Sequence, residues 1–322
     1  MIIELVLSLI PIGCAGLLAA LISGGAVSGV LDLPDFLGVT LVFIACIFIS
    51  GYGKAFIRIF YTKKKFEELS LEQLQKTELA LNLAAKILMY SALFIPFLCF
   101  INVLYNTPFE SIEMHSLGPN SAVQFTSVVY LCLFEMMIYT CKAKVRKSII
   151  LYMAEVDEAA MSETKITGKK IVKLVIGVIL LLVIAGVYLW ENIPHYINQR
   201  DAVRAIIDLP SFLIIVIFTV PLIAISGNLK NLWGAIKTVF SNTKINIAQK
   251  NLYLNVVKTT EILNWLGAIS ATVIGWIGMM NNLEDESSLY PNFAVSLITL
   301  FYAVLINFLF MVVETRVNSA AE

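Results

Sequence analysis

Eight stretches of nearly uninterrupted apolar residues follow one another along the chain, with shorter polar segments between them. Each has close to the ~20 residues that a helix needs to cross the hydrocarbon core of a bilayer. With 59% hydrophobic and only 14% charged residues, the chain is also far from the composition of soluble proteins. The pattern predicts an all-α integral membrane protein with eight transmembrane helices and no large soluble domain. The stretches are residues 5–22, 36–56, 83–104, 123–141, 172–190, 209–225, 262–280 and 293–313.

The same four-helix pattern occurs twice. The segment LDLPDF, which begins at Leu31, recurs 176 residues later as IDLPSF, and LGPNSAV recurs 172 residues after its first occurrence as LYPNFAV. A regular internal duplication indicates that the structural unit is half the chain. We expect two four-helix membrane repeats, at residues 1–147 and 171–322, joined by a polar linker at 148–170.

Lysine and arginine gather in alternate segments between the predicted helices. Residues 54–86, 142–173 and 230–258 hold seven, eight and five of them, whereas the opposite loops hold two, both in 191–206. Because segments rich in Lys and Arg stay in the cytoplasm, we predict that both termini are cytoplasmic. Each repeat has an even number of spans, so the two are parallel, which disfavours inverted-repeat transporters but not parallel-repeat ones.

The remaining composition excludes several classes of function. The five cysteines lie within or at the ends of predicted helices, so no disulfide framework is indicated. Formal net charge is zero, which gives no reason to expect nucleic-acid binding. No metal-ligand, catalytic-triad, paired-carboxylate or phosphate-loop motif occurs, so we expect neither an enzyme nor a metal or cofactor site. The inner segments 62–82 and 239–258 keep helical apolar spacing and predict extensions of the membrane helices.

Three segments of the second repeat resemble the MotA/TolQ/ExbB family of ion-driven membrane proteins. IDLPSFLIIV, starting at Ile207, is similar to the start of that family's second helix. MMNNLEDESSL, starting at Met279, is similar to the exit of its third helix and the outer loop, and AVSLITLFY, starting at Ala294, to its fourth helix. The resemblance covers the second repeat except its inner segment, and the first repeat is a fainter copy.

The resemblance implies a subunit of the bacterial inner membrane that forms a homo-oligomeric ring around a single-span, MotB- or ExbD-like partner. In this family an aspartate of the partner binds the transported H⁺ or Na⁺, and polar residues of the third and fourth helices of the ring line the path. Ion flow then drives a mechanical load, as in a stator or motor. The inner segments here are too short for the cytoplasmic domain with which MotA proteins grip a flagellar rotor.

Three hydroxyl residues are candidates for the ion path. The resemblance assigns Thr272 and Thr299 to it, and Ser127 is the equivalent of Thr299 in the first repeat, whereas Phe100 takes the place of Thr272. A second interpretation stays open, because a Ser or Thr in a spanning helix often bonds the carbonyl one turn earlier.

Glu135 is the only carboxylate well inside a predicted span, and Asn307 takes its place in the second repeat. An ionisable group in the membrane is costly unless it serves a partner or an ion path. Glu135 and Asn307 are therefore further candidates for ion binding or relay. Alternatively, Glu135 snorkels or pairs with a cation such as Lys142 near the cytoplasmic end.

The second helix of each repeat begins with an Asp and a Pro at the outer interface, Asp32 and Pro34 in the first and Asp208 and Pro210 in the second. A carboxylate in the first turn is stabilised by the helix dipole, and Pro suits the helix start. We therefore expect a helix-start role for these residues rather than ion entry.

Two other functions remain open. One is a non-conducting membrane scaffold descended from the same family. The other is a small-solute transporter with parallel repeats, which would need a binding site near the membrane midplane.

Overall fold

The structure is a computed structural model of the 322-residue chain and describes residues 2–22, 33–106, 114–154, 208–241, 244–280 and 286–320. Within these ranges there are helices and no strands, apart from an isolated bridge at Ile245. Most of the predicted linker and the predicted fifth membrane helix lie outside the described residues. The helices are α1 (Ile2–Ile22), α2 (Leu33–Ile49), α3 (Gly53–Ile57), the 3-10 helix η2 (Arg58–Phe60), α4 (Lys63–Glu67), α5 (Leu71–Asn106), α6 (Met114–Ala154), α9 (Leu209–Ile225), α10 (Leu229–Phe240), α11 (Ile247–Met280) and α12 (Glu286–Ala320).

Two helices of the described chain are long and apolar enough to cross a membrane, namely α11 and the Ser296–Ala320 part of α12. Two bent helix pairs would each add one more, which gives two to four candidate spans by length and composition. The all-α class predicted from the sequence is thus confirmed for the described residues, and the apolar helices agree with a place in the membrane.

Both repeats turn sharply at the same glycine. The pair Phe36–Ile49 and Gly53–Phe60 is bent by 118°, and the pair Leu209–Ile225 and Leu229–Phe240 by 113°. Gly51 and Gly227, which are 176 residues apart, have φ angles of 78° and 73° at these bends. Residues with a side chain rarely adopt such angles. The prediction of one continuous helix over 36–56 is therefore wrong.

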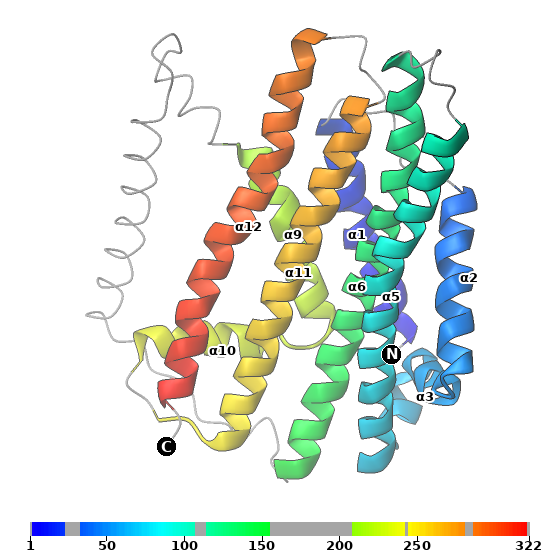
Figure 1. Ribbon diagram of the computed structural model, residues 1–322. Helices are drawn as coiled ribbons and strands as arrows, with labels where there is room; N and C mark the ends of the chain where they lie inside the picture. Colours follow the sequence, from blue (N-terminus) through cyan, green and yellow to red (C-terminus); the bar gives the residue numbers. More distant parts are fainter. Residues whose placement is uncertain are drawn as a thin grey trace.

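The helix after the second bend, α10, lies across the end of the bundle (Figure 1). It buries Asn231, Ala235 and Thr238 on one face and leaves Trp233 59% exposed on the other. The sequence did not predict this helix, because its apolar face is short and merges with the preceding apolar stretch. A helix with an exposed Trp and lysines on its outer face suits the interface between lipid and water.

Equivalent aromatic pairs join the second and fourth helices of each repeat. Phe36 and Tyr130 make an edge-to-face contact with ring centroids 5.6 Å apart, and Phe212 and Tyr302 make the same contact at 5.8 Å. Both members of the first pair correspond to those of the second by the sequence offsets. The duplication read from the sequence is therefore also present in the packing.

The two repeats share one hydrophobic core. Its largest cluster of buried residues takes side chains from α1, α6, α9, α10 and α11, and the most extensive contact between the repeats is that of α6 with α11. Figure 1 shows α12, α11, α6 and α5 next to one another, with α9 and α1 behind them. In the most apolar 18-residue stretch of α11, 72% of the residues are buried, compared with 22% in that of α12. Among the described helices, α11 is therefore central, whereas α12 is mostly exposed.

The third helix of each repeat is longer than a membrane is thick. α5 has 36 residues and α11 has 34, or about 50 Å at 1.5 Å per residue, whereas the hydrocarbon core measures ~30 Å. The inner segments from Leu71 and from Ile247 onward belong to these continuous helices, which confirms the prediction of helical extensions for that part of 62–82 and 239–258. The beginnings of the two segments differ from it, because Lys63–Glu67 forms the separate helix α4 and α10 ends at Phe240 before α11 begins.

Candidate functional site

The two threonines that the sequence places on an ion path meet between α11 and α12. The hydroxyl groups of Thr272 and Thr299 lie 3.2 Å apart, and each donates to the backbone carbonyl of Ser296, at 2.8 Å and 2.7 Å. Both side chains are buried. Since two hydroxyl protons serve three short contacts, one contact always lacks a proton. The bond of Thr299 runs to the preceding turn of its own helix, as the alternative interpretation expected, whereas the bond of Thr272 crosses from α11 to α12.

A glycine allows this close contact between the two helices. A Cβ atom added at Gly275 would lie 2.7 Å from the Cβ of Ser296, closer than real side chains approach. Small residues of this kind let membrane helices approach and bond one another directly. The threonine pair is thus part of a tight helix–helix contact.

A second group of polar side chains forms a chain across three helices. The hydroxyl of Thr219 on α9 donates to the amide oxygen of Asn264 on α11 at 2.7 Å, and the amide of Asn264 donates to the amide oxygen of Asn307 on α12 at 3.1 Å. The amide of Asn307 then donates to the backbone carbonyl of Glu261 at 3.3 Å. Thr219 and Asn264 are buried. Since unpaired polar groups are costly in an apolar surrounding, this chain fixes the three helices to one another.

Only Asn307 of this chain was a candidate from the sequence. Thr219 and Asn264 were missed because their partners are 45 and 43 residues away in the chain. A comparison of the two repeats could have identified them, because the positions equivalent to Thr219 and Asn264 in the first repeat are the apolar residues Phe43 and Ala92. A polar residue that replaces an apolar one in the other copy needs a partner.

The first-repeat candidates lie on α6. Ser127 is buried, and Glu135 is partly exposed. Among the residues that the structure describes, no cation lies within ion-pair distance of Glu135, and the ammonium of Lys142 instead stands 5.1 Å from the centroid of the Tyr139 ring. The ion pair of Glu135 with Lys142, one of the interpretations left open by the sequence, is not formed.

Asp208 caps the start of α9. Its carboxylate accepts hydrogen bonds from the backbone N–H of Ser211, at 3.2 Å, and from the Ser211 hydroxyl. The backbone N–H of Asp208 donates to the hydroxyl of Tyr302 at 3.0 Å, which ties α9 to α12. Pro210 lies in the first turn of the helix. In the first repeat, Pro34 lies in the first turn of α2, and Asp32 lies outside the described residues.

A polar cleft of about 610 Å³ opens between the repeats, at the end of the bundle that is rich in lysine and arginine. It lies among α5, α6 and α11, and its walls include Lys142 and the exposed ion pair of Arg146 with Glu78, at 3.4 Å. On the α11 wall, the amide of Asn255 donates to the backbone carbonyl of Ala143 at 3.0 Å, which holds the two repeats together. On α11 the cleft is lined by residues between Asn251 and Ile262, in the first half of the helix. Thr272 of the threonine pair lies in the second half of α11, away from the cleft.

The polar side chains of the second repeat, in the threonine pair and the polar chain, carry only hydroxyl and amide groups. They offer oxygen atoms to a cation or water, but none of them titrates in the physiological range. No group of three His, Cys, Asp or Glu side chains that could hold a metal ion occurs in the described ranges. A group that binds a proton near neutral pH is therefore absent from these two sets of side chains.

Comparison with known proteins gives no relative: no family model, no curated protein and no solved structure matches the chain.

Proposed function

We propose that the chain is a MotA-like membrane subunit that assembles a ring around a single-span partner and couples the flow of H⁺ or Na⁺ to mechanical work. In this proposal it crosses the bacterial inner membrane eight times, with both termini in the cytoplasm. The observation that carries the proposal is the packing of α6, the fourth helix of the first repeat, against α11, the third helix of the second.

This contact joins two different surfaces of the same kind of unit. α5 and α12 are the equivalents of α11 and α6, and their main contacts with other described helices lie within their own repeats. Contacts between unlike surfaces generate a ring when the rotation from unit to unit closes. The same contact between chains would join α12 of one copy to α5 of the next, and a ring of whole chains would hold an even number of repeats.

The polar groups of the second repeat support the same proposal. Thr272, Thr299 and Asn307 belong to the two helices that the family resemblance assigns to the ion path, and Asn264 is hydrogen-bonded to Asn307. These groups include no carboxylate. That composition suits a subunit whose ion-binding acid is supplied by a partner helix.

The decisive experiment has two parts. A gene for a short N-terminal span with an aspartate, next to the gene for this chain, identifies the partner, and particle images of the co-purified complex count the chains around it. H⁺ and Na⁺ flux is then measured in liposomes for the wild type, for Thr299→Val and for the first-repeat control Ser127→Ala. We expect Thr299→Val to lower flux more than the control does. Unchanged flux would remove Thr299 from the path.

The second candidate is a non-conducting scaffold, and one observation favours it. The hydroxyl groups of Thr272 and Thr299 are both bonded inside the protein, to each other and to Ser296. Absence of flux from the wild-type complex, with the partner bound, would select the scaffold. The cleft between the repeats gives little support to a small-solute transporter, which would need a binding site near the membrane midplane. The cleft lies instead at the end of the bundle that is rich in lysine and arginine.

A further inference from the structure

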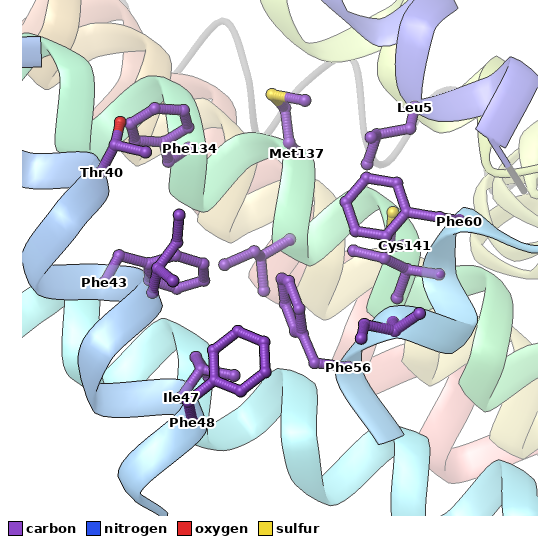
Figure 2. Close-up of a pocket in the computed structure, with 14 residues that line it drawn as sticks. Leu5, Thr40, Phe43, Ile47, Phe48, Phe56, Phe60, Phe134, Met137 and Cys141 are labelled. Carbon is purple, nitrogen blue, oxygen red and sulfur yellow. The ribbon is translucent and has the colours of Figure 1, made fainter. Parts of the chain in front are cut away.

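An apolar cavity of about 340 Å³ lies in the first repeat, where the chain turns from α2 into α3. Figure 2 shows Phe43, Phe56 and Phe60 around it, together with Met137 from α6. Its volume is in the range of small-molecule sites. The hydroxyl of Thr40 on its wall donates to the carbonyl of Phe36 at 2.7 Å, so its proton is not available to a ligand. Since a cavity without free polar groups does not hold water, this one suits hydrocarbon.

The mouth of the cavity faces outward. Four of its apolar wall residues are 42–60% exposed, on α2, α3 and η2. On a helix bundle in a membrane, such side chains contact lipid. These residues are Ile44, Phe48, Ile57 and Phe60.

A cluster of cations follows directly on the same short helices. Five Lys and Arg residues occur within residues 54–65, and this segment contains no Asp or Glu. The equivalent segment of the second repeat, 230–241, contains only two. Such clusters beside a membrane helix attract anionic lipid headgroups. We name this set the basic cluster, and its members are Lys54, Arg58, Lys63, Lys64 and Lys65.

Most of the basic cluster is available to a ligand. Lys54 and the three consecutive lysines are exposed, whereas Arg58 donates to the backbone carbonyl of Gln73 at 2.9 Å. Lys63 lies 3.9 Å from Glu67, but both side chains are more than 60% exposed. An exposed ion pair of this kind is weak and would yield to a headgroup phosphate.

The two repeats differ at this place. Phe43 lines the cavity, and its equivalent in the second repeat is Thr219, the first member of the buried polar chain. The second repeat thus uses this level of the bundle for internal hydrogen bonds. The first repeat leaves an apolar space there, beside the basic cluster.

We propose that this cavity binds one acyl chain of an anionic phospholipid, and that the lipid's phosphate-bearing headgroup lies on the basic cluster. The site requires a membrane on the outer side of α2 and headgroups at the level of α3 and α4. It does not require ion conduction, so it stands apart from the motor proposal.

Native mass spectrometry of the full-length protein tests the site. The protein is purified in detergent and mixed with equal amounts of dioleoyl phosphatidylglycerol and dioleoyl phosphatidylcholine. We expect phosphatidylglycerol to be retained at least about fivefold better than phosphatidylcholine. The triple variant Lys63→Gln/Lys64→Gln/Lys65→Gln should lose most of this preference. Its control, with the same loss of charge in the second repeat, should keep it; this control is Lys237→Gln/Lys244→Gln/Lys250→Gln.

The cavity is tested separately from the headgroup. Ile44→Trp places a larger side chain at the mouth and should reduce retention of both lipids. The control Val220→Trp alters the equivalent position, which is 43% exposed, and should leave retention unchanged. Equal retention of the two lipids by the wild type, or undiminished retention by Ile44→Trp, would overturn the proposal.

A fluorescence measurement covers the case in which a variant folds poorly. All four tryptophans of the chain lie in the second half, so Phe60→Trp in an otherwise unchanged basic cluster supplies a reporter at the cavity. Phosphatidylglycerol with brominated chains should quench the added emission more strongly than brominated phosphatidylcholine at the same mole fraction. Equal quenching by the two lipids would contradict a site selective for anionic headgroups.

Discussion

The side-chain amide of Asn264 donates a hydrogen bond of 3.1 Å to the amide oxygen of Asn307, and this bond joins α11 to α12 within a buried polar chain. Ala92 and Glu135 take the two places in the first repeat. The two copies therefore share their helix order and their bends, but this bond exists only in the second. Among the described residues, the polar chain is thus a property of the second repeat.

Removal of two members of this chain should show that they act together. Thr219→Val removes a donor and Asn264→Leu removes its acceptor, so each variant leaves a buried polar group with one partner fewer. We expect a loss of roughly 1–3 kcal/mol for Asn264→Leu. The double variant should lose less than the sum, with a coupling energy of ~0.6 kcal/mol and at most ~1.7 kcal/mol. Unfolding in mixed micelles measures all four proteins, and strict additivity would contradict the bond.

Gly275 should not accept even a methyl group. Because an added Cβ would lie 2.7 Å from the Cβ of Ser296, Gly275→Ala should force α11 and α12 apart and destabilise the protein by ~1–3 kcal/mol. The second change Ser296→Gly removes the atom in conflict and should restore part of the loss. The control is Gly16→Ala, where nothing lies within 4 Å of the added atom. A melting temperature equally low for both single variants would argue against the contact.

The cap at the start of α9 could be predicted from the sequence because the residues that form it are neighbours in the chain. Asp208 and Pro210 lie within three residues of each other in the chain, and the cap uses the next turn of the same helix. The same role was then predicted for Asp32 and Pro34, the equivalent residues of the first repeat. The threonine pair was within reach for another reason, since the family resemblance names both Thr272 and Thr299.

The bends were not predictable from apolar pattern alone. The stretch 36–56 stays apolar through Ser50 and Gly51, and glycine inside a helical pattern is tolerated. Whether Gly51 takes a helical or a positive φ depends on the packing of α3 beneath the bundle. The polar chain was not predicted for a related reason. Hydrogen bonds between residues more than 40 positions apart produce no periodic pattern of apolar and polar residues in the sequence.

Both bend glycines should resist replacement, and to a similar degree. A side chain at φ near +75° costs ~1–2 kcal/mol, and no atom within 4 Å of Gly51 adds to that cost. Gly51→Ala should therefore destabilise the protein by this amount, and Gly51→Asn by less, because Asn tolerates the left-handed region better. Gly227→Ala should match Gly51→Ala if the repeats use the bend alike. Unfolding curves of the three variants, in one detergent, provide the comparison.

Asp208 should stabilise α9 through its cap rather than through an ion. Asp208→Ala removes the acceptor for the Ser211 backbone N–H and should cost ~0.5–2 kcal/mol. Asp208→Ser keeps a capping oxygen without the charge, so it should recover most of the stability. If Asp208 only caps, then Asp208→Ser should also keep wild-type ion flux in the reconstituted complex. Wild-type stability combined with lost flux in Asp208→Ser would instead assign the carboxylate to ion entry at the outer end of the bundle.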